Sequence, residues 1–296
     1  PSVLPGGRPV GDAAARVDVG AAWGVGGLPD AAGRDTAAIL RGVHSGHLRA
    51  LVVGGVDPYD LPDPTAALAA VDAAPFVVSL EQRASAVTER ADVVLPVAAV
   101  VEKAGTFVDW EGRHRPFAEV LRGTSSMPDV RVLHVLAEQM GVDLGLPDVA
   151  SARAEIDDLG VWDGDRAAFD PVEAEPPAPA VLAKGDVVLS TWPLLLDGGR
   201  LQDGEPYLAG TAKPAVARMS RATAEGVGVG DGDTVTVSTD RGEVSAPAVV
   251  TDMPDGVVWL PTNTGAVRVR RDLAAANGSR VRLRAGSAAV APGGNR

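Results

Sequence analysis

Short apolar runs alternate with segments of helical periodicity in the first half of the chain. The apolar runs are rich in Val and Leu and are bounded by Gly, Pro or charged residues, which is typical of strands. They predict strands at residues 48–54, 75–80 and 91–95. Other segments predict helices: one opened by Asp35-Thr36 and ended by Gly46, and further ones at residues 65–72, 82–90, 129–141 and 151–159. Strands and helices alternating at this spacing predict a parallel, Rossmann-like sheet with right-handed crossovers.

The segment 129–141 has the clearest helical pattern of the chain. Its apolar positions recur at helical spacing, at Val132, Leu133, Leu136 and Met140. We expect Asp129 to cap the start of this helix and Gly141 to end it. His134 has apolar neighbours in sequence, and we interpret it as a packed or surface histidine rather than a catalytic one.

A strand followed by a hairpin is predicted before that helix. The apolar run at 91–95 stops at Pro96, which is typical of a buried parallel strand that leaves its sheet. Polar and apolar residues then alternate, and Gly112 closes a polar turn. We therefore expect a hairpin at residues 106–117 with a three-residue, glycine-ended loop.

The second half of the chain has short β-rich runs separated by glycine-containing turns. The runs lie at residues 186–191, 234–239, 243–250 and 256–260, and the turns at 230–233, 239–242 and 254–256. This series indicates a small β-barrel. Residues 163–180 are rich in Pro, Ala and acidic residues and lack an apolar period, which is linker composition. We predict an α/β domain at residues 1–162, a linker at 163–180, a barrel at 181–288 and a tail at 289–296.

Composition narrows the possible functions. With 296 residues, 46% of them apolar, the chain has room for two domains with their own cores. Its net charge of −12 argues against a nucleic-acid partner. The absence of cysteine excludes disulfides and cysteine-ligated iron–sulfur clusters within these residues. No apolar run approaches the roughly 18–20 residues of a membrane span, so we expect no direct membrane insertion. The first residue is Pro1 and the start is rich in Gly, Ala and Pro, so we expect a C-terminal piece of a longer protein.

A glycine group and a histidine pair invite a binding-site interpretation that their spacing does not support. The glycines within 24–27 fail the G-x-G-x-x-G spacing of dinucleotide loops, and Pro29 lies where the helix should run, so we expect a plain loop. His44 and His47 lie three residues apart without further metal ligands nearby. We interpret them as a solvated helix end.

Two blocks of the chain resemble the molybdopterin oxidoreductase superfamily. The first lies within residues 91–113, and its matched positions are Ala91, Asp92, Val93, Val94, Leu95, Pro96, Glu102, Lys103, Gly105, Thr106, Phe107, Glu111, Gly112 and Arg113. One departure is Asp109, where the family usually has Asn, and it argues against a bound pterin. The second block, at residues 223–244, resembles the core of the family's dinucleotide-binding domain. The resemblance implies a Rossmann-like domain followed by a six-stranded double-psi barrel.

A closer resemblance involves residues 191–220 and 250–263. These segments look like the large iron–sulfur subunits of bacterial proton-pumping NADH:quinone oxidoreductases, of the actinobacterial type. In that family an N-terminal portion holds iron–sulfur clusters, and the C-terminal portion is a molybdopterin-enzyme relic that has lost its cofactor. The resemblance implies a scaffold without catalytic residues, metal ligands or cofactor of its own, in a complex that carries electrons from NADH to quinone. The implied partners are other subunits of the peripheral arm, on the cytoplasmic side of the membrane.

The alternative is a C-terminal part of an active molybdopterin oxidoreductase, such as a formate dehydrogenase. The resemblance then implies five cofactor-cleft residues that hold the pterin phosphates by hydrogen bonds and charge: Glu102, Lys103, Thr106, Arg113 and Thr211. A stand-alone binding module is a further alternative, for which a native start near Pro1 would be the distinguishing feature.

Several of these residues also have ordinary structural interpretations. Glu102 beside Lys103 is typical of a solvated pair that contributes little. The basic group at 113–115 either meets an acidic neighbouring subunit or is solvated. Three tryptophans in loop or linker contexts are either interface anchors or local packing, and they are Trp110, Trp162 and Trp192.

Overall fold

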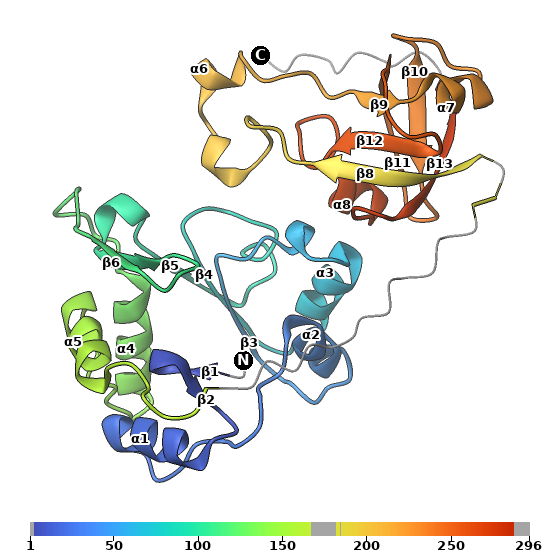
Figure 1. Cartoon of the computed structure of the whole chain (residues 1–296). Helices are drawn as coiled ribbons and strands as arrows, with labels where there is room; N and C mark the ends of the chain where they lie inside the picture. The colour runs from blue at the N-terminus through green and yellow to red at the C-terminus, as the bar shows by residue number, and fades with distance from the viewer. Residues whose placement is uncertain (1–2, 167–181, 184, 287–296) are drawn as a thin grey trace. The chain divides into compact units, whose positions relative to one another are not determined.

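The computed structural model describes residues 3–166, 182–183 and 185–286. The chain divides into two units, one formed by Pro1–Asp57 with Ala66–Glu173 and the other by Pro58–Thr65 with Ala174–Arg296 (Figure 1). The short segment 58–65, which lies within the predicted first domain, therefore groups with the second unit. Most of the predicted linker at 163–180 and the predicted tail at 289–296 lie outside the described residues. The predicted domain boundaries stay predictions.

A three-stranded parallel sheet lies at the centre of the first unit. Its strands are β3 (Leu51–Gly54), β4 (Val77–Glu81) and β5 (Val93–Pro96), in the order β3-β4-β5. Both strand pairs are parallel, so the predicted Rossmann-like sheet is confirmed. The middle strand β4 is buried along nearly all its length, as expected for a parallel sheet with helices on its faces.

Helices pack on both faces of this sheet. Helices α2 (Thr36–His44) and α3 (Pro64–Ala73) cover one face, and α4 (Asp129–Gln139) lies on the other. On the first face, the helices pack against the sheet through a buried cluster of Val43, Leu51, Ala70, Val71 and Val77. The second face is joined by the buried cluster Val78, Leu80, Val97 and Val132. Neighbouring residues of β4 serve opposite faces because side chains alternate along a strand.

The other elements of the first unit are short strands and two further helices. They are β1 (Val3–Leu4), β2 (Arg8–Pro9), α1 (Ala13–Trp23), the hairpin β6 (Gly105–Val108) with β7 (His114–Phe117), and α5 (Val149–Leu159). Among the described residues, no helix combines the length and the apolar character that crossing a bilayer requires.

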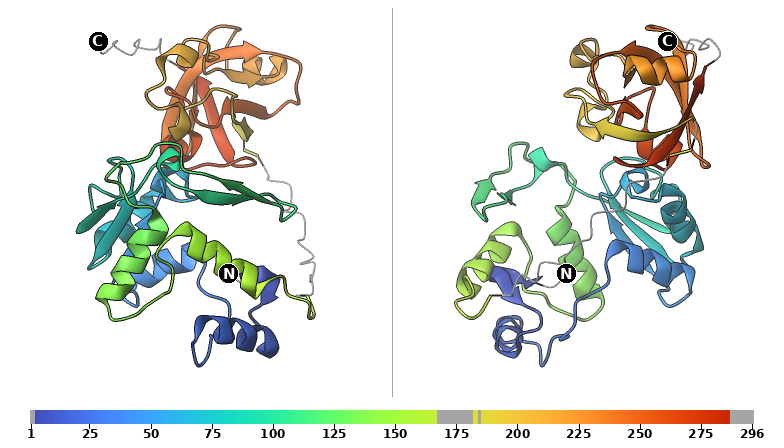
Figure 2. Two further views of the ribbon diagram at one scale, coloured as in Figure 1. Left: turned by 90° about the vertical axis from the view of Figure 1, so that its left-hand side faces the viewer. Right: turned by 45° about the vertical axis from the view of Figure 1, so that its right-hand side comes forward.

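The second unit contains a closed barrel of six strands (Figure 2). They are β8 (Asp186–Trp192), β9 (Ala217–Met219), β10 (Thr234–Ser238), β11 (Glu243–Val250), β12 (Val257–Pro261) and β13 (Arg280–Ala285). Around the barrel the order is β10-β11-β9-β12-β8-β13. Strands β8 and β12 are parallel, as are β9 and β11, and the other four pairs are antiparallel. This is the double-psi type of barrel that the resemblance implies.

The barrel interior is filled by aliphatic side chains. The largest fully buried ones are Leu189, Met219, Leu260, Leu273, Val235, Val237, Val258, Val267 and Val269. Strand β11 illustrates the alternation of side chains that fills the interior: Val244, Ala246 and Ala248 are buried and alternate with exposed residues. Short helices lie between the strands: α6 (Pro206–Ala209), α7 (Arg221–Gly226) and α8 (Val269–Leu273).

The predicted helix at 82–90 is wrong, because this segment forms turns. Ser85 and Thr88 explain the difference. The backbone N–H of Ser85 donates to Thr88 Oγ1 (2.7 Å), and the backbone N–H of Thr88 donates to Ser85 Oγ (3.2 Å). Such local side-chain bonds compete with helical backbone pairing. The crossover from β4 to β5 is therefore made without a regular helix.

Two smaller predictions about the first unit also fail. Strand β5 is not buried, since Val93 is 37% and Val94 43% exposed, because β5 is an edge strand that pairs on one side only with β4. Asp129 does not cap α4: Pro128 occupies the capping position, and the Asp129 carboxylate instead pairs with Lys103.

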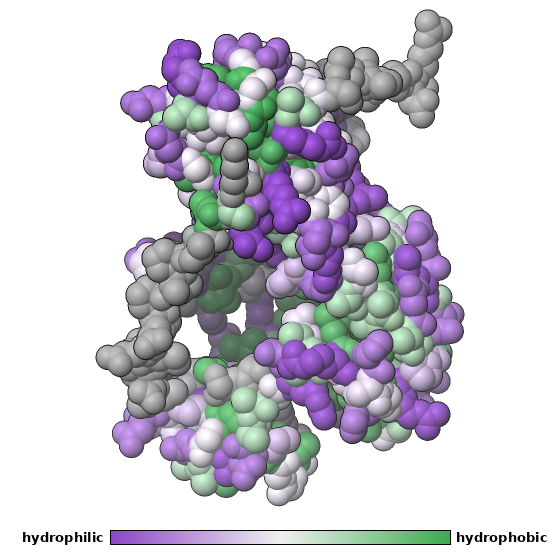
Figure 3. Space-filling model, turned by 90° about the vertical axis from the view of Figure 1, so that its right-hand side faces the viewer, coloured by the Kyte–Doolittle hydropathy of each residue, from purple (hydrophilic) through white to green (hydrophobic). Residues whose placement is uncertain are grey.

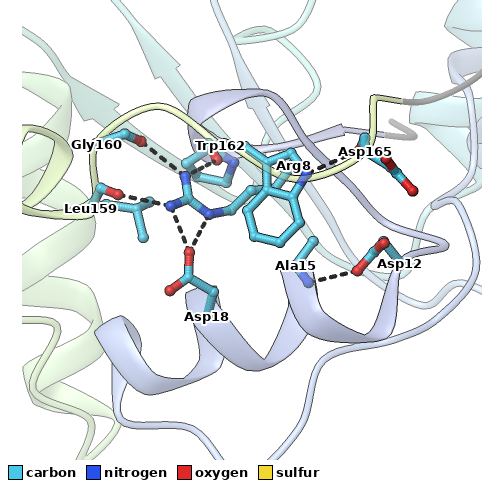
Figure 4. A network of polar contacts seen from close by, with 9 residues as sticks. Arg8, Asp12, Ala15, Asp18, Leu159, Gly160, Trp162 and Asp165 are labelled. Carbon is cyan, nitrogen blue, oxygen red and sulfur yellow. Dashed lines mark hydrogen bonds and ion pairs between the residues drawn. The ribbon is translucent and has the colours of Figure 1, made fainter.

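A buried arginine joins two distant segments of the first unit (Figure 4). Arg8 is only 3% exposed, and its Nη2 and Nε both lie 2.6 Å from Asp18 Oδ2. Its Nη2 also donates to the carbonyl of Leu159 (2.7 Å), and its Nη1 donates to that of Gly160 (2.9 Å). Its guanidinium lies over the ring of Trp162, 5.6 Å from the centroid. A buried guanidinium is tolerated only when paired and hydrogen-bonded in this way.

We expect Arg8→Met to destabilise the first unit. Removing one partner of a buried ion pair costs about 3–5 kcal/mol, and because Asp18 remains 47% exposed we expect a smaller loss of about 2–3 kcal/mol. Urea denaturation of the chain measures this. The matched control is Arg34→Met at an exposed position, for which we expect little change. Equal effects of the two substitutions would contradict the account.

Candidate functional site

The resemblance-derived candidates Glu102 and Lys103 bind other parts of the chain rather than each other. Glu102 ends a short 3-10 turn, Val100–Glu102, and its Oε2 accepts the backbone N–H of Ala99 (2.9 Å). Lys103 Nζ pairs with the carboxylate of Asp129, the first residue of α4. Lys103 is 22% exposed, so the interpretation of Glu102 and Lys103 as a solvated pair is wrong. Both side chains fix the backbone between β5 and the hairpin.

The hairpin β6–β7 carries the next part of the family signature, and its predicted form is confirmed. Asp109 N–H donates to the carbonyl of Arg113 (3.2 Å), which leaves a three-residue loop that ends at Gly112 with φ of +79°. The Asp109 carboxylate accepts the backbone N–H groups of Glu111 (3.0 Å) and Arg113 (2.9 Å). Asp109 therefore stabilises the turn locally, through an oxygen that Asn would also supply.

Arg113 forms an ion pair within its own loop. Its Nη2 lies 2.5 Å from Glu111 Oε2, two residues earlier in the same loop, and its side chain is 60% exposed. A pair of this exposure contributes little to stability. His114 and Arg115 are also exposed, so the prediction that this basic group meets an acidic neighbour stays a prediction.

Thr106 is held by an arginine that the sequence did not single out. Arg153 of α5 donates through Nε to Thr106 Oγ1 (3.0 Å), and its Nη2 donates to the carbonyls of Gly105 and, at 3.4 Å, Phe117. One guanidinium therefore holds both strands of the hairpin. Gly105 is required next to it, because a Cβ there would lie 2.4 Å from the ring of Phe117.

Helix α5 positions Arg153 and has a charged cap of its own. Asp148 accepts the backbone N–H (2.8 Å) and the hydroxyl (2.9 Å) of Ser151, and these hydrogen bonds lower the pKa of the Asp148 carboxyl. A lowered folded-state pKa means that the cap stabilises the helix at neutral pH. That contribution is lost as the pH falls through the folded-state pKa.

Thr211 belongs to the second unit, so neither unit alone contains all five candidates. It follows α6, and its hydroxyl donates to the carbonyl of Leu208 (2.8 Å). Every one of the five polar side chains thus already has a partner within its own unit. These contacts use only part of the hydrogen-bonding capacity of Lys103, Thr106 and Arg113, each of which keeps further N–H or O–H donors.

The remaining candidates divide into packed and exposed residues. Trp162 packs locally, since it lies beside Arg8 and its Nε1 donates to the carbonyl of Asp165 (3.0 Å). Trp110 is 93% and Trp192 70% exposed, so their proposed role as interface anchors stays a prediction. His134 is buried and packed, with Nε2 3.5 Å from Glu138 Oε1.

The histidine pair and the glycine group both lie at the ends of helices. Within the described ranges, no group of three or more His, Cys, Asp or Glu residues is arranged to hold a metal ion. The nitrogen Nδ1 of His47 instead lies 2.7 Å from Ser45 Oγ at the end of α2. The glycines within 24–27 follow α1, and Gly24 ends that helix with φ of +63°.

Comparison with known proteins adds an independent finding. Residues 21–137 match the family model "Molybdopterin oxidoreductase", and residues 202–287 match "Molydopterin dinucleotide binding domain". The chain is 53% identical, over 97% of its length, to the G subunit of the NADH-quinone oxidoreductase of Mycobacterium bovis. It is 51% identical, over 96% of its length, to the same subunit of Streptomyces coelicolor. It spans about a third of the length of these curated relatives (36% and 34%).

A solved structure supports the fold alone. Acetylene hydratase from Pelobacter acetylenicus superimposes with a TM-score of 0.51 at 16% identity, over 83% of this chain and 42% of that chain. At this identity the similarity says that the chain path is shared, and nothing about the reaction.

We expect Arg153→Met to loosen the hairpin without unfolding the barrel. The substitution removes three hydrogen bonds, including those to the carbonyls of Gly105 and Phe117, and we expect a loss of about 1–3 kcal/mol. Hydrogen exchange measured by mass spectrometry should show faster exchange in residues 105–117 and unchanged exchange in the barrel. Arg122→Met, at an exposed position, is the matched control. Unchanged exchange at 105–117 in the Arg153 variant would contradict the assignment.

Proposed function

The chain belongs to the molybdopterin oxidoreductase family, in the branch of the NADH-quinone oxidoreductase G subunits, and we propose that it is a cofactor-less scaffold within such a protein. In this proposal the parent complex transfers electrons from NADH to quinone and pumps protons. The residues of this chain hold neighbouring parts of the complex in place and take no part in the chemistry.

The observation that carries the proposal is the use of the five candidate cleft residues inside the chain. Glu102 binds the backbone of Ala99, and Lys103 pairs with Asp129. Thr106 accepts from Arg153, Arg113 pairs with Glu111, and Thr211 donates to Leu208. Each of these contacts stabilises a turn, the hairpin or a helix end, which is the role that the proposal assigns to these residues.

The electron-carrying groups belong to other parts of the proposed complex. The chain has no cysteine, so any cysteine-ligated cluster is held elsewhere. We place the clusters in the part of the full-length protein that this chain does not match, and the other partners among the subunits of the peripheral arm. That arm lies on the cytoplasmic side of the membrane in this proposal.

The exposed aromatic residues supply candidate contacts for those partners. Trp110 at the tip of the β6–β7 hairpin and Trp192 at the end of β8 are both largely exposed. Large aromatic side chains on a surface are the residue type that most often anchors a protein interface.

We expect the double substitution Arg113→Gln with Thr211→Ala to leave NADH:quinone oxidoreductase turnover unchanged. In the described part of the chain Arg113 pairs with Glu111 of its own loop and Thr211 with Leu208 of the preceding helix, so their loss removes weak local interactions. Turnover is measured per assembled complex, purified with the variant protein. Lys103→Met is the comparison variant: it breaks the pair with Asp129, so we expect less assembled complex and normal turnover per complex.

The alternative of an active pterin enzyme makes the opposite forecast for the same variants. If Arg113 and Thr211 held pterin phosphates, their loss would lower turnover per assembled complex and release the pterin. Such a result would overturn the scaffold proposal.

A further inference from the structure

Helix α4 and its C-terminal capping residue, Met140, carry an apolar stripe that the described structure covers only in part. Leu133 is 44%, Leu136 37% and Met140 74% exposed. At about 100° per residue, these positions fall within an arc of about 60° on the helix surface. The stripe is therefore one continuous strip of apolar side chains rather than scattered exposed residues.

The same helix is already packed through other positions. Val132 (8% exposed) joins the cluster on β4, and His134 is 5% exposed. A surface helix of a globular protein normally has one apolar face and a polar remainder. In α4 that face is covered only at one edge, because the buried Val132 lies about 40° around the helix from Leu136. Val142 (51%) and Leu144 (42%) continue the exposed apolar sequence beyond the end of the helix.

Exposed apolar residues occur elsewhere too, but those of the stripe differ from them in their regular helical spacing. Figure 3 shows one face of the molecule, where apolar residues reach the surface among polar ones in both units. Single exposed apolar residues are ordinary on protein surfaces. Apolar residues at positions i, i+3 and i+7 of one helix are the pattern by which helices and grooves recognise each other.

The length of the relatives points to what covers the stripe. This chain matches 36% of the length of the Mycobacterium bovis relative, so about two thirds of such a protein lies beyond the matched part. We propose that the stripe of Leu133, Leu136 and Met140 binds the apolar face of a helix from that remaining part of the same polypeptide. The proposal rests on the scaffold function proposed above and identifies the surface through which the scaffold is attached.

Methionine oxidation tests this contact directly. The chain has four methionines, of which Met140 lies in the stripe and Met219 is completely buried in the barrel core. Hydrogen peroxide converts an accessible methionine into its sulfoxide, which peptide mass spectrometry quantifies residue by residue. The rate is compared in three preparations: the 296-residue chain alone, the full-length subunit alone, and the assembled complex.

We expect Met140 to oxidise rapidly in the chain alone and to slow almost to the rate of Met219 in the full-length subunit alone. Slowing only in the assembled complex would assign the stripe to another subunit and overturn the proposal. Slowing in the chain alone as its concentration rises would assign it to a second copy, with the same consequence. Rapid oxidation in all three preparations would show that nothing docks there.

A pair of variants at the end of α4 provides a second measurement. Met140→Ser, at a position 74% exposed in this chain, should lower the melting temperature of the full-length subunit but not that of the 296-residue chain, whereas Gln139→Ser, at an exposed polar position, should change neither. Equal behaviour of the two variants in the full-length subunit would contradict the docking.

Failure of the docking and failure of the scaffold function give different results. If the full-length protein purifies within an active NADH-quinone oxidoreductase while Met140 stays accessible, only the docking is wrong. If it does not join such a complex, the scaffold function is wrong, and the protection of Met140 in the isolated full-length protein is still measured.

Discussion

Buried and half-buried guanidinium groups are the constraint on which the first unit depends. Arg8 is nearly inaccessible, and it is stable there because Asp18 and the carbonyls of Leu159 and Gly160 surround it. Arg153, six positions before Leu159 on α5, holds the β6–β7 hairpin by its own carbonyl contacts. Helix α5 is thus fixed to the start of the chain at its end and to the hairpin in its first turns. A guanidinium suits both places because its donors form a rigid, planar fork.

On the scaffold function proposed here, this arrangement explains how a family signature can persist without its chemistry. The polar signature residues from Glu102 onward lie in the turn before the hairpin, in the hairpin and in its loop, and they pair with the backbone or with a nearby charge. Lys103 joins α4 to that turn through Asp129, and Asp109 organises the loop by accepting two backbone N–H groups. Folding alone therefore favours these residue types at these positions. The pattern supports family membership, and function has to be argued from contacts.

The elements predicted from the sequence were those with a strong local period. The strands β3, β4 and β5, the barrel strands β8, β10, β11 and β12, and the hairpin all follow from apolar runs and glycine turns. Helix α1 was missed because its alanine-rich sequence has no apolar stripe, although Asp12 caps its start. Strand β13 was overlooked despite a clear period of two, in which Val281 and Leu283 are buried between exposed arginines. The contacts of Arg8 with Gly160 and of Arg153 with Thr106 join residues 152 and 47 positions apart, and no local pattern indicates such partners.

The central claim is that this part of the protein carries no pterin and no metal, and elemental analysis of the purified native complex tests it most directly. Molybdenum, tungsten and iron are measured together with pterin released on denaturation. The account predicts iron, from clusters outside this chain, with no molybdenum, tungsten or pterin. Molybdenum or tungsten close to one per complex, accompanied by pterin, would contradict it.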